Sequence, residues 1–235
     1  MLLAAGAGLP RELSDAAHAA GIETVILPPH PLLPSPVAAH TDLLIHPLGD
    51  VLYTFRDYRG IAAHEIDRIC DAAGISLEYI SAVPGEKYPA DVPLCARRIG
   101  RHFIANPRTA PELCRKAAER GLDVIPVAQG YTACSAAVCG DCIVTADRGI
   151  TKAARGAGIQ VLEIREGDID LPGYDHGFIG GCCGFCAERG EVWFTGDPLT
   201  HPDGAAILDF LRARGLHPVI PRSGRLFDCG GMFFI

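Results

Sequence analysis

The stretch Thr109–Asp147, TAPELCRKAAERGLDVIPVAQGYTACSAAVCGDCIVTAD, begins with a predicted helix. Thr109 and Glu112 have the spacing of a capping box, in which each side chain bonds to the backbone at the other residue. The apolar residues that follow recur at helical spacing as far as Gly121. Because glycine takes the left-handed conformation without steric cost, Gly121 is a typical end for this helix.

The second half of the same stretch has the pattern of strands. Leu122–Val127 is a short apolar run that predicts one strand. The runs Ala133–Val138 and Cys142–Thr145 are separated only by Gly140-Asp141, a pair typical of two-residue hairpin turns. The whole stretch therefore predicts a unit of helix, strand and hairpin.

This unit occurs five times along the chain. The glycines that end the five helices, each followed by an apolar strand pattern, are Gly21, Gly74, Gly121, Gly158 and Gly215. The hairpin of the fifth unit stops at Ile235 after its first strand, and the apolar segment Met1–Ala5 is a candidate for the missing partner. Pairing of the two would complete the last module without exposing a sheet edge. We therefore predict an α/β fold, a closed five-fold pseudosymmetric α/β propeller.

Length and composition support one ordered domain, residues 1–235. The chain has 235 residues, of which 49% are hydrophobic, and no segment has the composition of a linker. A net charge of −7 argues against binding to nucleic acid. No apolar run reaches the 18 residues of a membrane span, and the start of the chain lacks a signal-peptide pattern. We expect a cytoplasmic protein with reduced thiols.

Polar residues stand at the entrance to each of the five hairpins. Four are acidic and one is a threonine, namely Asp42, Asp91, Thr132, Asp175 and Asp228. An aspartate at one such place is explained by a local turn. Four around one axis would repel one another without a cation, so the set predicts a site for a small positively charged ligand.

Two further residues next to these entrances suggest catalysis. His176 follows Asp175, and Cys229 follows Asp228. A thiol, an imidazole and carboxylates facing one channel would form the arrangement that a nucleophilic cysteine needs. The alternative is that Cys229 packs as a small apolar residue and that His176 bonds to the backbone.

Four segments resemble a known superfamily over most of the chain: YPADVPLCARRIG from Tyr88, QGYTACSAAV from Gln129, ITKAARGAGIQVLEI from Ile150 and LPGYDHGFIGG from Leu171. Together with the five modules, they resemble the guanidino-group-modifying enzymes of the pentein fold, and more closely an uncharacterised bacterial branch with a domain of unknown function.

The resemblance implies hydrolysis or group transfer at the C–N bond of a guanidino or other cationic amidine compound. By that resemblance Cys229 is the nucleophile and His176 handles the proton. Asp42 and Asp91 match the acids that bind the substrate. No cofactor is implied. A pentein scaffold that binds a small molecule without catalysis is the alternative.

Cysteine spacing offers a third hypothesis. Cys139 and Cys142 form one CxxC pair, and Cys183 and Cys186 form another in the next module. Two such pairs on hairpin turns are typical of a structural zinc or iron–sulfur site. Against this, other modules keep the same hairpin pattern without cysteine, as at His46–Asp50.

Overall fold

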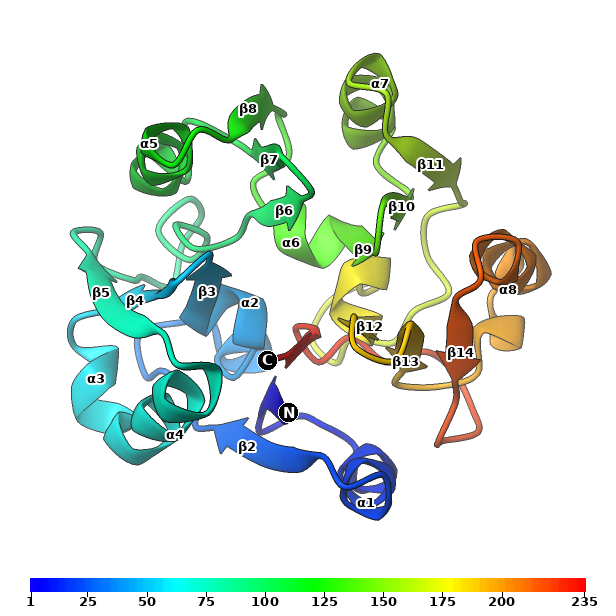
Figure 1. The fold of residues 1–235 in the computed structure, drawn as a ribbon, viewed down its shortest axis with the longest axis horizontal. Coiled ribbons are helices and arrows are strands. Elements are labelled where there is room, and N and C mark those ends of the chain that lie inside the picture. The colour runs from blue at the N-terminus through cyan, green and yellow to red at the C-terminus, as the bar shows by residue number, and fades with distance from the viewer.

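The computed structural model describes residues 1–235 and contains five three-stranded sheets arranged around a common centre (Figure 1). In each sheet the middle strand pairs antiparallel with one neighbour and parallel with the other. In spatial order the strands of the five sheets are β15 (Met232–Phe234), β1 (Leu2–Gly6) and β2 (Glu23–Leu27); β3 (Ile45–Leu48), β4 (Val51–Phe55) and β5 (Ser76–Ile80); β6 (Arg97–Ile99), β7 (His102–Ala105) and β8 (Asp123–Pro126); β9 (Ala136–Cys139), β10 (Cys142–Thr145) and β11 (Gln160–Glu163); β12 (Cys183–Cys186), β13 (Glu191–Phe194) and β14 (His217–Val219).

The longer helices lie on the outside of the molecule, and each connects the two parallel strands of one sheet (Figure 1). These five helices are α1 (Arg11–Ala19), α4 (Ala63–Ala73), α5 (Pro111–Glu119), α7 (Arg148–Gly156) and α8 (Gly204–Arg212). The remaining helical segments are short: α2 (Thr41–Leu44), α3 (Tyr58–Ile61) and α6 (Thr132–Ser135), with 3-10 turns η1 (Ser35–Val37), η2 (Ile179–Cys182) and η3 (Pro198–Thr200).

The repeating unit in space differs in phase from the unit predicted along the chain. The strand after a helix joins the sheet of the preceding hairpin, so β8 pairs with β7 and not with β9. A helical crossover returns the chain parallel to the strand that it left, which a two-residue turn cannot do. The module is therefore hairpin, helix and strand.

The two ends of the chain meet in one sheet. β1 pairs antiparallel with β15, with Leu3 opposite Phe234, as predicted from the incomplete fifth hairpin. The predicted closed ring is not present as a continuous sheet, because hydrogen bonding within each sheet ends after three strands. The five sheets fit five-fold pseudosymmetry, and the neighbouring modules are joined by side-chain packing.

Two local predictions for the Thr109–Asp147 stretch were wrong. The residue before α5 is Ala110, no side chain caps this helix, and the Glu112 carboxylate instead accepts hydrogen bonds from Ser81 in the neighbouring chain segment. The segment at Ala133, predicted as the start of a strand, forms the short helix α6. Tertiary partners thus override the local pattern at both places.

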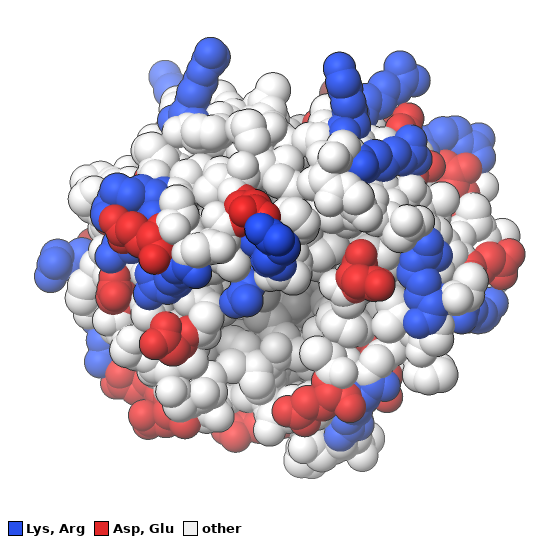
Figure 2. Space-filling model, turned by 45° about the horizontal axis from the view of Figure 1, so that its top comes forward, with Lys and Arg blue, Asp and Glu red and all other residues white.

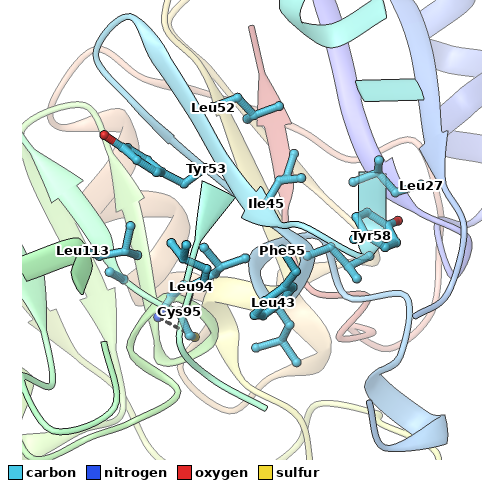
Figure 3. Packing of buried hydrophobic residues seen from close by; sticks show 14 of the residues in the cluster. Leu27, Leu43, Ile45, Leu52, Tyr53, Phe55, Tyr58, Leu94, Cys95 and Leu113 are labelled. Atoms are coloured by element: carbon cyan, nitrogen blue, oxygen red, sulfur yellow. Dashed lines mark hydrogen bonds between the residues drawn. The ribbon is translucent and has the colours of Figure 1, made fainter. Parts of the chain in front are cut away.

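The largest group of buried apolar side chains lies between the β15-β1-β2 and β3-β4-β5 sheets and extends to the β6-β7-β8 sheet (Figure 3). In this cluster Leu43 from α2 and Ile45 from β3 lie near Leu94 and Cys95, which precede β6. Full burial of one such leucine contributes about 1.5–3 kcal/mol. This packing fixes α2 at the centre of the molecule.

None of the helices has both the length and the apolar composition to cross a bilayer.

Candidate functional site

A pocket of about 290 Å³ lies beside the entrances to the hairpins. Its polar walls contain three carboxylates, two imidazoles and one thiol, and no lysine or arginine. These residues are Glu166, Asp175 and Asp228, His40 and His176, and Cys134. The remainder of the lining is apolar or aromatic: Val37, Leu43, Tyr131, Leu171, Tyr174 and Phe178. Because the lining has three carboxylates and no lysine or arginine, we expect this pocket to prefer a cation.

The elements that build the pocket are the short helices in front of the hairpins. His40 directly precedes α2, and Leu43 is the third residue of that helix. Tyr131 and Cys134 have the corresponding positions at α6. This correspondence is a signal that aligning the two helices would have revealed. His40 and Cys134 were not predicted as site residues, because the residues that open the hairpins were aligned and not the starts of the short helices.

Asp42 is a buried carboxylate next to this pocket. It is the second residue of α2, is 1% exposed, and neither of its oxygens has a hydrogen-bond partner. Burial raises the pKa of Asp42 to about 6, against the opposing effect of the neighbouring His40 and Arg97. Donor atoms of His40, Asp42 and Cys134 all lie within 4.8 Å of one another.

Asp228 also has a fixed position. It is 1% exposed, and its carboxylate accepts hydrogen bonds from the backbone N–H groups of Phe178 at 2.8 Å and Gly230 at 3.0 Å. Its Oδ1 lies 3.7 Å from Nδ1 of His40. Asp228 therefore joins the fourth and fifth modules and faces the pocket.

The other predicted substrate-binding residues lie in three different settings. Asp91 is buried behind Tyr131, whose hydroxyl donates to it, and its second oxygen has no partner. Burial, followed by this hydrogen bond and the Asp91 charge, raises the pKa of Tyr131. Thr132 donates to the carbonyl of Gln129 at 2.7 Å and stabilises a turn. Asp175 is exposed and lines the pocket from its outer side.

The five residues were predicted to occupy equivalent places in their modules. In the structure they do not. Asp42 stands three residues before β3, Asp228 four before β15, and Asp175 eight before β12. Asp42, Asp91 and Asp228 are nevertheless all buried. Their burial comes from tertiary packing and not from a repeated position.

The two residues predicted to be catalytic are not joined by a hydrogen bond. His176 lines the pocket, with Nδ1 3.0 Å from the carbonyl oxygen of Gly177 and Nε2 3.4 Å from Glu166. The Cys229 thiol is 2% exposed, lies outside the pocket lining, and donates to the carbonyl of Gly181 at 3.7 Å. Burial raises the pKa of Cys229, and the charges of Asp228 and Asp42 raise it further.

The four cysteines of the CxxC pairs do not form one metal-binding set. Cys139 and Cys142 face each other across the β9–β10 turn, but Cys183 and Cys186 lie on one strand, β12. Residues three apart on a strand point to opposite faces. Cys186 accordingly contacts Met1, and Cys183 packs in the apolar cluster that contains Cys139. The hairpin turn expected between Cys183 and Cys186 comes after Cys186.

A second cavity, of about 820 Å³, adjoins the pocket and shares Glu166, His176 and Phe178 with it. Its walls carry charges of both signs, including Arg148 and Arg165 beside Glu163 and Asp203. The charge pattern of the smaller pocket, and not cavity size, therefore identifies the candidate site. Figure 2 shows one face of the molecule, on which acidic and basic side chains intersperse around a central hollow.

Solved structures with the same fold are enzymes that act on guanidino compounds. A dimethylarginine dimethylaminohydrolase variant, solved as an adduct with S-methyl-L-thiocitrulline, superposes with a TM-score of 0.58 at 13% identity over 93% of this chain and 91% of that chain. The enzyme from Pseudomonas aeruginosa, solved with citrulline, gives a TM-score of 0.55 at 13% identity over the same shares. SxtG, an amidinotransferase from Microseira wollei, gives 0.51 at 12% identity over 89% and 76%.

These likenesses confirm a mixed α/β fold like that of the pentein enzymes, without the predicted closed ring. No curated protein matches the sequence. One family model matches residues 7–233, nearly the whole chain. The chain therefore belongs to the family of unknown function DUF6873.

Proposed function

We propose that the pocket binds a small guanidino or other cationic amidine compound and that the protein hydrolyses or transfers a group at its C–N bond. The observation that carries this proposal is the pocket lining, which holds Glu166, Asp175 and Asp228 and no lysine or arginine. A guanidinium carries one delocalised charge and several N–H donors, so carboxylates at different angles suit it. The stacked rings of Tyr131 and Phe178 add flat apolar surface.

Four aspartates have roles in this proposal. Asp228 and Asp175 bind the cation directly from the wall and the outer side of the pocket. Asp42 and Asp91 contribute negative potential from behind the lining, each with at least one unpartnered oxygen. In this low-dielectric setting their charges act strongly on a ligand.

Cys229 is the proposed nucleophile. It directly follows Asp228, whose carboxylate lines the pocket. Without ligand, the charges of Asp228 and Asp42 oppose ionisation of the thiol. A bound guanidinium neutralises these charges, so substrate binding itself favours the thiolate. The thiol proton passes to His176, the sulfur bonds to the guanidinium carbon, the C–N bond breaks, and His176 gives this proton to the leaving amine. Water, or an acceptor amine, subsequently displaces the sulfur.

Thiol labelling tests this proposal. An electrophilic amidine is added at neutral pH, and the labelled cysteine is found by peptide mapping. We expect selective labelling of Cys229, protection by guanidinium, and loss of labelling in His176→Ala. The half-buried Cys70 and Cys114 serve as controls. If Cys229 reacts no faster than they do, or if Cys134 is labelled in its place, the assignment of Cys229 is wrong.

A second candidate function is binding without catalysis. It is favoured by the position of Cys229, which is buried and outside the pocket lining. Calorimetry with guanidinium compounds separates the two functions. In a binding protein Cys229→Ala keeps full affinity, and the wild type releases no amine or ammonia from any bound guanidino compound.

A further inference from the structure

Three potential metal ligands lie together at the pocket, and they come from two modules that are far apart in the sequence. His40 precedes α2, Asp42 belongs to it, and Cys134 is the third residue of α6. Their donor atoms lie within 4.8 Å of one another, and the residues are 5%, 1% and 3% exposed. No other group of three such side chains is as close.

Asp42 supplies an independent reason to expect a cation. Both of its oxygens are buried and neither accepts a hydrogen bond. Buried carboxylates are normally paired with a cation or hydrogen-bonded, because an isolated one loses its hydration without compensation. Asp42 is therefore a buried carboxylate without a hydrogen-bond partner.

A nearby arginine does not fill this need. Arg97 is close enough for its charge to act on Asp42. Its guanidinium N–H groups, however, donate to the backbone carbonyls of Ala133, Ala136 and Gly180. Arg97 thus ties together the third and fourth modules, and the Asp42 oxygens stay free.

We propose that His40, Asp42 and Cys134 bind one divalent transition-metal ion of the zinc class. One imidazole, one carboxylate and one thiolate form a mixed donor set that suits Zn²⁺ or Co²⁺, whereas Mg²⁺ and Ca²⁺ prefer oxygen ligands alone. This site shares no residue with the CxxC pairs, which were the alternative hypothesis for a zinc or iron–sulfur site.

The surroundings support such an ion. His40 and Cys134 line the pocket, so a fourth ligand has access from the cavity. The Asp228 carboxylate, 3.7 Å from Nδ1 of His40, is placed to orient the imidazole. Cys95, with its sulfur 3.7 Å from that of Cys134, can donate an S–H hydrogen bond to a metal-bound thiolate.

The metal site goes beyond the proposed function and does not depend on it. A metal ion and a guanidinium are both cations, and they would compete for the field of Asp42 and Asp228. We therefore expect a metal ion to weaken binding of amidine compounds. Metal binding itself is measured without any enzymatic readout, so failure of either proposal leaves the other testable.

Cobalt titration of chelator-treated protein is the decisive experiment. We expect one equivalent of Co²⁺ to bind, with a thiolate-to-cobalt charge-transfer absorption that Zn²⁺ abolishes by displacement. Cys134→Ser should lose this absorption. Asp42→Asn and His40→Gln should each lower affinity by about 100-fold or more, since changes outside the first ligand sphere already cost 10–100-fold. The matched control Cys95→Ser should keep the absorption.

Two results would overturn the site: a wild type without charge-transfer absorption, and an absorption that persists in Cys134→Ser. In the second case, loss of the absorption in Cys139→Ser would assign the thiolate to the CxxC region. Circular dichroism checks that each variant is folded. If Cys134→Ser does not fold, the affinities of Asp42→Asn and His40→Gln decide, and unchanged values would refute the proposal.

Discussion

Two regions of this protein contain buried cysteines, and their surroundings differ. In the pocket region, formed by His40, Asp42 and Cys134, the thiol lies beside an imidazole and an unpartnered carboxylate. In the cysteine core, formed by Cys139, Cys142 and Cys183, the thiols lie in an apolar cluster and donate to backbone carbonyls or lie against one another.

The two regions differ in the polar groups that lie beside the thiols, and the spacing of the cysteines along the chain does not account for this difference. The hydrogen bond to Cys183, and burial, raise the pKa of Cys139, so the cysteine core holds neutral thiols that pack as small apolar side chains. The pocket region keeps a buried charge that the fold does not satisfy. Such unsatisfied groups cost stability and are typical of binding sites.

The largest expected effect comes from Gly180, which lies between the two regions in η2. A Cβ at this residue would lie 2.3 Å from the carbonyl oxygen of Ala133 and 2.6 Å from that of Cys134. Because these atoms are backbone, Gly180→Ala must displace α6, and we expect a loss of at least about 3 kcal/mol in the free energy of unfolding. Denaturant titration measures it.

The control for this substitution is Gly156→Ala. Gly156 ends α7, and a Cβ there would meet nothing within 4 Å. We expect the free energy of unfolding of Gly156→Ala to stay within about 0.5 kcal/mol of the wild-type value. Equal stability of Gly180→Ala and Gly156→Ala would show that the two regions do not depend on the α6–η2 contact.

The next effect concerns pH and the first hairpin, which continues from the pocket region. His46 on β3 is buried with Nε2 unpartnered, and burial, assisted by the Arg97 charge, lowers its pKa to about 3. Between pH 6.5 and 3 the unfolded chain binds a proton that the folded chain does not, so stability falls as pH falls. From pH 6.5 to pH 4 this group should remove about 3 kcal/mol.

His46→Leu checks the assignment, because leucine fills a similar volume without titrating. We expect the variant to lose about 3 kcal/mol less than the wild type over the same pH interval in urea titrations. Parallel curves for the two proteins would place the acid sensitivity elsewhere in the molecule.

The smallest effects should have opposite signs in the two regions. In metal-free protein at pH 8, Asp42→Asn removes an unpaired buried charge and should raise the free energy of unfolding by about 2 kcal/mol. Cys139→Ser places a hydroxyl in the apolar cysteine core and should lower it by about 1–2 kcal/mol. Two changes of the same sign would remove the proposed contrast between the regions.

Much of the fold could be predicted from the sequence, because it depends on local patterns. Glycines with positive φ at Gly21, Gly74 and Gly121 mark the ends of α1, α4 and α5, as predicted. The pairing of β1 with β15 followed from counting strands in the repeats. The phase of the module was missed, since the partner of a strand is set by the crossover helix and not by the nearest turn.

The sequence by itself determined five modules, their helices and strands, and a concentration of acids near the hairpin entrances. Only the tertiary structure decided which side chains share the pocket. His40 and Cys134 are 94 residues apart along the chain, and packing of two modules brings them together. A sequence motif is recognised from residues that are close along the chain. Burial of a side chain and the lack of hydrogen-bond partners depend instead on every module packed around the site.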